Sequence, residues 1–267
     1  MEIKRGDLGM DTFVYKQAAG ITALSASMSE FEYVKHSHEE YAMGVTLRGV
    51  QQYNLDGSFQ SSYRDGVMLF HPEQVHDGRS QDRTGIDYVM VYIHPKLFME
   101  LAGVKEIVKF SSPIVYNRRL KQSILHLVRA IFGNQDEALC YELLAALADH
   151  FSEIEMSTMF GKGDSLITRA KEMIYANLDH VLKLDELCGE LGMTKFQFIR
   201  AFKANTGISP YRFFLNSKLE HAKRMIEKNK DIYAAVAACG FVDLSHLNKH
   251  FKRVYGITAR EYISNIR

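Results

Sequence analysis

The sequence predicts a multidomain α+β protein, with a β-rich N-terminal domain and an all-α C-terminal domain. Three observations predict this fold class. One pattern occurs twice near the C-terminus, at residues 198–213 and 247–262. The hydrophobic period is short in the first ~105 residues and helical from Asn117 onward. Charge is also divided, since the part from Asp164 onward has 17 Lys and Arg against 11 Asp and Glu, and the rest has 16 against 21.

Short apolar or alternating runs between turn residues predict the strands of the first domain. The clearest strands are Phe31–His36, Tyr41–Leu47, Gln51–Leu55, Val67–Phe70 and Ile86–Ile93. Asp56–Gly57 predicts a hairpin, because a type I′ turn needs positive φ. Arg64–Asp65–Gly66 and Asp77–Gly78 predict further turns. Many short strands at this spacing favour a sandwich or a small barrel.

Two helices are expected at about 117–160, after the strands. The first has the apolar stripe Leu120, Ile124, Leu127, Val128 and Ile131. The second is expected from about Gln135 to Met159, with the apolar face Leu139, Leu143, Leu147, Phe151 and Ile154. Such stripes pack on a sheet or form a dimer interface, and we expect both here.

Gly161–Asp164 is the best domain boundary, because its two glycines make it flexible. We therefore expect an N-terminal domain over 1–160, a linker over 161–164 and a C-terminal domain over 165–267. In the last, helix Leu166–Leu178 precedes the first copy of the repeat, and Pro210 begins a helix that connects the two copies.

The two copies have the construction of tandem helix-turn-helix units, at about 184–206 and 232–255. Phe198, Phe202–Lys203 and Gly207–Ile208 match Leu247, Phe251–Lys252 and Gly256–Ile257 at an offset of 49 residues. Within each copy a short apolar helix ends at a glycine, and a second helix follows. The second helix turns polar and cationic side chains outward, and these suit phosphates and base edges. They include Gln197, Arg200 and Lys203 in the first copy and Asn248, Lys249 and Lys252 in the second. A solvated helix face is the alternative for one copy alone, and the duplication argues against it.

Charge and composition narrow the class of protein. The net charge of +6 after Asp164 and of −5 before it fits DNA binding through the C-terminal domain. No apolar run reaches the ~18 residues of a membrane span, and the first residues lack the apolar centre of a signal peptide. Cys140, Cys188 and Cys239 are expected to be buried thiols in a cytoplasmic protein, with a redox switch as the alternative.

The C-terminal ~100 residues resemble the AraC/XylS family of bacterial transcription regulators. The resemblance rests on Met193–Thr194, Arg200–Lys203, Gly207–Pro210, Ala222, Gly240–Phe241, Asp243, Ser245, Phe251–Lys252 and Gly256–Thr258. It implies seven helices that hold two recognition helices in adjacent major grooves, about 34 Å apart on one face of the DNA.

The resemblance also implies which residues read bases. The first helix presents Phe196, Ile199 and Arg200, and the second presents Ser245, His246 and Lys249. The sequence departs from the family pattern in four places: Ile199 where a polar reader is common, Lys218 and Lys249 in place of arginines, and Ala259 in place of a proline. Lysine lacks the bidentate fork of arginine, so base discrimination by the second helix is expected to be weaker or directed elsewhere.

In the first domain, His36–Tyr41, Gly49, Gly66–Pro72 and His76 resemble the cupin-like effector domain of sugar-type members, which implies a barrel that holds one small ligand. The expected lining residues are His36, His38, Tyr41, Arg48, His76, Tyr88 and Tyr92. A metal held by His36, His38 and His76 with Glu39 or Glu40 is one alternative. The other is purely structural, with the histidines paired to neighbouring carboxylates.

Together these features predict a sequence-specific transcription regulator that is controlled by a small-molecule effector. Activation is the usual outcome in the family, and repression is the alternative. Its expected partners are double-stranded DNA, the effector, RNA polymerase and a second copy of the chain. No cofactor, catalytic residue or membrane contact is expected. The alternatives are a metal-dependent cupin enzyme fused to a DNA-binding module, and an interaction module that no longer binds DNA.

Overall fold

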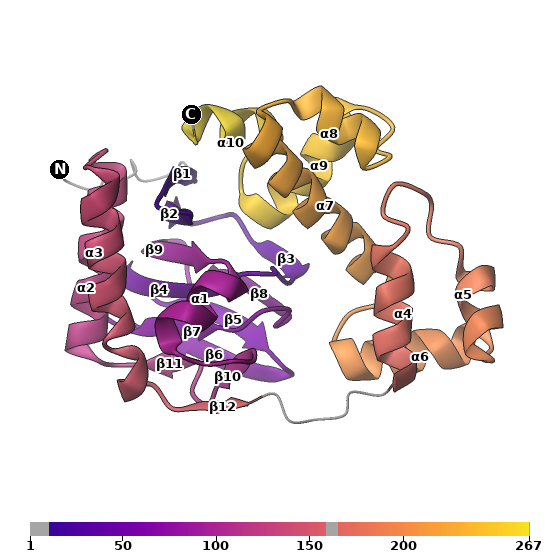
Figure 1. Cartoon of the computed structure of the whole chain (residues 1–267), viewed down its shortest axis with the longest axis horizontal. Coiled ribbons are helices and arrows are strands. Elements are labelled where there is room, and N and C mark those ends of the chain that lie inside the picture. The colour runs from indigo at the N-terminus through magenta and orange to yellow at the C-terminus, as the bar shows by residue number, and fades with distance from the viewer. Residues whose placement is uncertain (1–10, 159–164, 267) are drawn as a thin grey trace. The chain divides into compact units, whose positions relative to one another are not determined.

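The computed structural model describes residues 11–158 and 165–266. The chain divides into two units, a β-rich one built mostly from residues before 160 and a helical one built mostly from those after it (Figure 1). The predicted linker over 161–164 lies outside the described residues.

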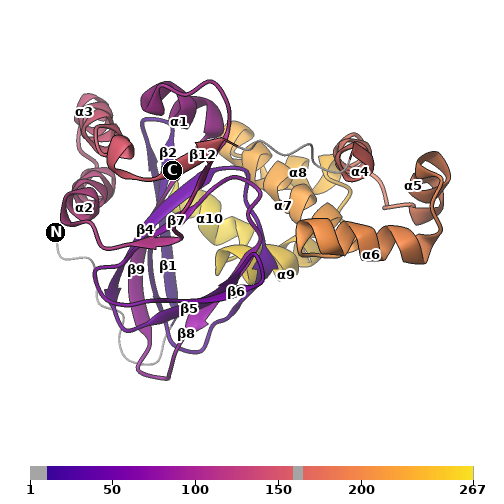
Figure 2. The same cartoon turned by 90° about the horizontal axis from the view of Figure 1, so that it is seen from below.

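Twelve strands occur in the described residues, and all but β3 (Tyr33–His36) lie wholly in the first unit. They are β1 Thr12–Ala18, β2 Ile21–Met28, β3 Tyr33–His36, β4 Tyr41–Arg48, β5 Gln51–Leu55, β6 Ser58–Ser62, β7 Val67–Phe70, β8 His76–Ser80, β9 Ile86–Ile93, β10 Val108–Phe110, β11 Ile114–Val115 and β12 Met156–Thr158. The larger sheet has the antiparallel order β1-β2-β9-β4-β7-β11, and the smaller has the order β3-β8-β5-β6. Figure 2 shows the two sheets around a common interior.

The alternation of side chains along β4 and β9 creates two separate apolar layers. Met43 and Val45 on β4, with Val89 and Val91 on β9, face the helices and are fully buried. The stripe predicted on α2 (Arg118–Phe132) packs into this same layer, and α3 (Glu137–Ala148) packs beside α2. The prediction that the helix pair packs on the β domain is therefore confirmed.

The hairpin predicted at Asp56–Gly57 is present. It joins β5 to β6, and its two residues have φ of 48° and 82°. The turn predicted at Asp77–Gly78 is wrong, because both residues lie inside β8. There Asp77 accepts a hydrogen bond from the backbone N–H of Asn54 at 2.6 Å. Gly78 leaves space for the ring of Tyr33, which lies 3.4 Å from where a Cβ would stand.

The second predicted helix is shorter than expected. It ends at Ala148 instead of continuing to Met159, which lies outside the described residues. A 3-10 turn at Phe151–Glu153 follows, and β12 then pairs with β10. Phe151 still reaches the core, where its ring stacks on Phe98 (α1, Pro95–Ala102) with 4.7 Å between ring centroids. The apolar spacing thus predicted the burial of Leu147, Phe151 and Ile154 correctly, but Leu139 is 39% exposed and the helix ends before Phe151.

Seven helices make up the described part of the second unit, as the resemblance implied. They are α4 Ser165–Tyr175, α5 Leu184–Leu191, α6 Lys195–Thr206, α7 Pro210–Asn229, α8 Ile232–Ala238, α9 Leu244–Tyr255 and α10 Ala259–Asn265. We call α4–α6 the first subdomain and α8–α10 the second. The long helix α7 lies between them and contacts helices of both (Figure 1).

Candidate nucleic-acid interface and barrel interior

Helix α6 begins and ends at residues that suit its termini. Thr194 is its N-cap and forms a capping box with Gln197, whose backbone N–H donates to Thr194 Oγ1 at 3.3 Å. The Gln197 side-chain oxygen in turn accepts from the Thr194 N–H at 3.0 Å. Gly207 ends the helix with a φ of 78°. Gln197 therefore serves the helix terminus, although its position on the outer face suggested a reading residue.

Helix α9 is built in the same way. Asp243 is its N-cap and accepts from the backbone N–H of His246 at 2.7 Å. Gly256 ends it with a φ of 79°. Both helices are 12 residues long, so the repeat in sequence is a repeat in structure.

The inner faces of the two helices also make equivalent contacts. Phe202 of α6 meets Phe213 of α7, with 5.4 Å between ring centroids. Phe251 of α9 meets Tyr262 of α10 at 5.6 Å. Each pair is related to the other by the 49-residue offset. The helices are thus held by matching aromatic anchors, which leaves their opposite faces outward.

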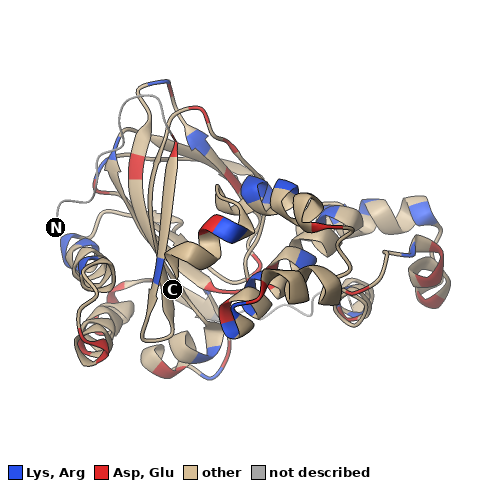
Figure 3. Ribbon diagram, turned by 90° about the horizontal axis from the view of Figure 1, so that it is seen from above, with Lys and Arg blue, Asp and Glu red and all other residues tan. Residues whose placement is uncertain are grey.

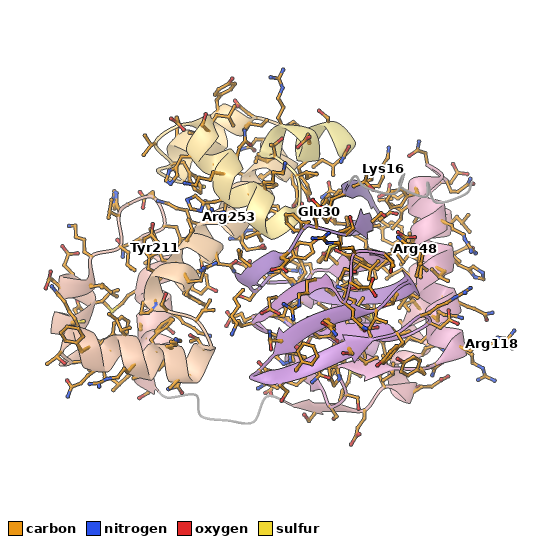
Figure 4. All side chains as sticks on the ribbon, turned by 180° about the vertical axis from the view of Figure 1, so that it is seen from behind. Lys16, Glu30, Arg48, Arg118, Tyr211 and Arg253 are labelled. Atoms are coloured by element: carbon orange, nitrogen blue, oxygen red, sulfur yellow. The ribbon has the colours of Figure 1, made fainter. Side chains whose placement is uncertain are left out.

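The outward faces carry the residues predicted to bind DNA. Phe196 is 78% exposed, and five others are also exposed: Arg200, Lys203, Ser245, Lys249 and Lys252. Ile199 and His246 are only partly exposed. The His246 ring contacts those of Phe241 and His250, at 5.6 and 4.9 Å. Figure 4 labels Arg253, a further exposed cation of α9.

Charge is not uniform over the second unit. Basic side chains are spread along its helices, whereas α5 carries the acidic residues Asp185, Glu186 and Glu190 (right-hand end of the ribbon in Figure 3). Lys195 at the start of α6 pairs with Asp185 at 2.6 Å. The acidic helix is therefore the half of the first helix-turn-helix that suits DNA least.

Val242 was not predicted to be exposed, although it is 85% exposed immediately before the N-cap of α9. Its place beside a helix N-cap was the signal in the sequence that could have found it.

Asn248 was one of the residues predicted to face outward from α9, but the structure shows that it has a structural role. Its Oδ1 accepts from the backbone N–H of Ala259 at 3.0 Å, so it is joined to the start of α10.

His38 and His76 of the first unit are buried, and so is His36, which belongs to a short segment, Val34–Ser37, grouped with the second unit. The Nδ1 of each lies 2.8 Å from a backbone oxygen two residues away, that of Val34, Glu40 or Gln74. A carbonyl oxygen only accepts, so each Nδ1 carries a proton and the backbone fixes the orientation of each ring.

Several predicted lining residues come together. The ring centroid of His38 is 5.1 Å from that of His76 and 5.5 Å from that of Tyr92. Tyr88 shares a hydroxyl–hydroxyl hydrogen bond of 2.7 Å with Tyr33. Burial raises the pKa of both tyrosines, so their hydroxyls stay protonated.

Two predicted lining residues lie elsewhere. Tyr41 is on the helix-facing side of β4, where it stacks on Phe98 with 3.7 Å between centroids and its hydroxyl donates to the Val108 oxygen at 3.0 Å. Strand alternation sends it away from the interior. Arg48 forms an ion pair with Asp87 at 2.7 Å and its side chain is 45% exposed. Both placements differ from the expectation that these residues line the ligand site.

Gln51 on β5 was missed. It is buried, and among the described residues nothing donates a hydrogen bond to its Oε1. An inward strand position with Tyr53 and Leu55 as its alternating neighbours was the signal. As for a metal, the described residues contain no group of three or more His, Cys, Asp or Glu that could hold one.

Two known protein domains match this chain, one in its N-terminal part and one in its C-terminal part. Residues 18–148 match the AraC-like ligand binding domain, and residues 187–265 match a helix-turn-helix domain. The chain belongs to the AraC/XylS family of transcriptional regulators. The metal-dependent enzyme alternative gains no support from these matches.

Similar proteins extend over most of this AraC/XylS regulator. It is 24% identical over 226 residues to the uncharacterised HTH-type regulator YbfI of Bacillus subtilis, a match that covers 81% of this chain and 82% of YbfI. It is 20% identical to the transcriptional activator RhaS of Escherichia fergusonii, over 90% of each chain. The crystal structure of ToxT from Vibrio cholerae has the same fold, with a TM-score of 0.58, 13% identity and coverage of 92% of this chain and 98% of ToxT.

No helix among the described residues of this AraC/XylS regulator has the length and apolar character needed to cross a bilayer.

Proposed function

We propose that this regulator binds double-stranded DNA sequence-specifically, with α6 and α9 in successive major-groove segments on one face of the duplex. The matching construction of the two helices carries this proposal, because equivalent caps and aromatic anchors present two equivalent outer faces. Phe196, Ile199 and Arg200 would meet bases from α6, and Ser245, His246 and Lys249 would do so from α9. Lys203 and Lys252 would bind phosphates.

A small molecule in the barrel interior is proposed to control this binding. His38, His76 and Tyr92 gather there, with Tyr88 on the same strand face and His36 buried nearby in sequence. Such a ligand shifts the balance between two arrangements of the protein only by its different affinity for each.

We further propose that the chain acts in the cytoplasm as a homodimer, formed through the outer surface of α2 and α3, and that it activates transcription by contacting RNA polymerase. Leu139 and Tyr141 on α3 support the dimer, because these two apolar side chains, one on each side of the buried face of the helix, stay 39% and 51% exposed. Sedimentation of wild type and of Tyr141→Glu tests this, with a monomeric variant expected. A wild-type monomer at micromolar concentration would reject the interface.

The DNA proposal is tested with duplexes selected from a random pool by the full chain. Arg200→Ala is expected to weaken specific binding by about 1–3 kcal/mol if it reads a guanine. Lys230→Ala is the matched control, since this exposed cation lies at the end of α7 and outside both recognition helices. Equal affinities and base preferences for Arg200→Ala and wild type would remove Arg200 from the reading surface.

A further inference from the structure

A single buried ammonium group is bonded to both subdomains of the DNA-binding unit. Lys218 lies on α7 and is 6% exposed. Its Nζ donates to the backbone oxygen of His180 at 3.2 Å and to that of Gly240 at 3.3 Å. His180 precedes α5 in the first subdomain, and Gly240 lies in the turn between α8 and α9 in the second. Lys218 therefore connects the two halves directly.

Aromatic rings complete the surroundings of this ammonium. Nζ lies 4.9 Å from the ring centroid of Phe214 and 5.5 Å from that of Phe241. Phe214 is on α7, and Phe241 belongs to the turn before α9. Cation–π attraction is stronger where water is excluded, and carbonyl dipoles stabilise a desolvated cation. The site holds the lysine head group firmly between the subdomains.

The backbone contact at Gly240 shows how closely the subdomains approach there. A Cβ on Gly240 would lie 2.1 Å from the Asp179 oxygen and 3.5 Å from Lys218 Nζ. Gly192 ends α5 at the turn of the first helix-turn-helix, 48 positions earlier, and no heavy atom of the described residues lies within 4 Å of such a Cβ there. The turn of the second helix-turn-helix thus rests on the loop of the first subdomain, beside Lys218.

We propose that Lys218 is a positioning residue that fixes the separation of α6 and α9, and so fixes the number of base pairs between the two DNA segments bound together. This inference rests on the proposed DNA binding. Once one recognition helix is bound, a fixed spacing holds the other at a high effective concentration near its own DNA segment. This advantage is lost if the contact between the two subdomains loosens. Each subdomain keeps its own aromatic anchor without Lys218, so each recognition surface survives.

The test compares wild type with Lys218→Met, a variant of similar length that lacks the ammonium. The probe is a selected two-segment duplex, together with versions in which the spacer between the segments is one or two base pairs longer or shorter. Wild type is expected to lose affinity steeply when the spacing changes. Lys218→Met is expected to bind the original duplex at least about tenfold more weakly and to discriminate little between spacings. Duplexes with only one segment should bind both proteins equally.

Three controls separate this role from general destabilisation. Lys218→Arg should keep the spacing preference, because a guanidinium also donates to two carbonyls. Gly192→Ala should lower stability without changing the spacing preference, whereas Gly240→Ala should weaken it. If Lys218→Met does not fold, Gly240→Ala and Lys218→Gln decide in its place. A lysine variant that keeps the wild-type spacing preference overturns the inference, and a wild type that binds no duplex overturns the proposed function instead.

Discussion

The side-chain oxygen of Asn248 on α9 accepts a hydrogen bond of 3.0 Å from the backbone N–H of Ala259, the first residue of α10. The equivalent residues of the first copy, 49 positions earlier, are Ile199 and Pro210. Proline has no N–H, so the first copy has no donor to satisfy and an apolar residue serves. The two departures of the second copy from the first therefore compensate each other.

This relationship predicts energetic coupling between the two positions. Asn248→Ala should lower the free energy of unfolding by about 1 kcal/mol, because it removes a helix-terminus hydrogen bond. The same change should cost much less in an Ala259→Pro background, where the donor is already gone. Urea unfolding followed by circular dichroism measures the stability of wild type, of each single variant and of the double variant, which together form a double-mutant cycle. Additive costs would show that the bond contributes nothing.

Gly240 and Gly192 form a matched pair for a second prediction. Both have positive φ, 57° and 63°, so alanine costs about 1–2 kcal/mol at either one through backbone strain. Only at Gly240 would the new methyl group also strike the Asp179 oxygen. The thermal transition of the helical unit should therefore fall further in Gly240→Ala than in Gly192→Ala. Equal shifts would mean that the loop moves aside freely.

His71 predicts a pH dependence of stability. Burial lowers its pKa below the ordinary 6.5, so the folded chain takes up the proton only at lower pH than the unfolded chain does. The stabilisation that buried, neutral His71 gives the folded chain is complete above about pH 6.5. It is lost as the pH falls through the folded-state pKa. The melting temperature should drop less between pH 7.5 and 5.5 in His71→Gln than in wild type. An NMR titration that places the His71 pKa above 6.5 would contradict this account.

The barrel interior gives a prediction at Gln51. Its buried Oε1 lacks a donor among the described residues, so Gln51→Leu should leave the melting temperature unchanged or raise it. If an effector donates a hydrogen bond to this oxygen, the variant should respond less to that effector. Thermal-shift screening of wild type and variant against the same metabolites measures both effects. A clearly destabilised variant would show that Gln51 already serves the fold.

The elements that the sequence predicted correctly are mostly those whose defining residues lie close together in the chain. The glycine turns and apolar spacing that define α5, α6, α8 and α9 lie within each copy of the repeat, and the hairpin at Asp56–Gly57 depends on only two residues. Strand β12 could not be predicted, since Met156–Thr158 is extended only because it pairs with Val108–Phe110, far away in sequence.

In the candidate sites, too, features set by nearby residues were predicted and features set by distant contacts were not. Exposure of Arg200 and Lys249 followed from helical periodicity. Tyr41 was misplaced because the side of β4 that meets helices depends on packing from α1 and α2, which no local pattern specifies. Asn248 and Gln197 were open to reading roles until the structure showed their bonds to helix termini.

Helices α6 and α9 are proposed to bind one duplex together. Hydroxyl-radical footprinting of the full chain on a selected duplex tests it most directly. We expect two protected patches about 10 base pairs apart on the same face of the DNA, one weakened by Arg200→Ala and the other by Lys249→Ala. A single patch, or two patches that both respond only to Arg200→Ala, would contradict the account.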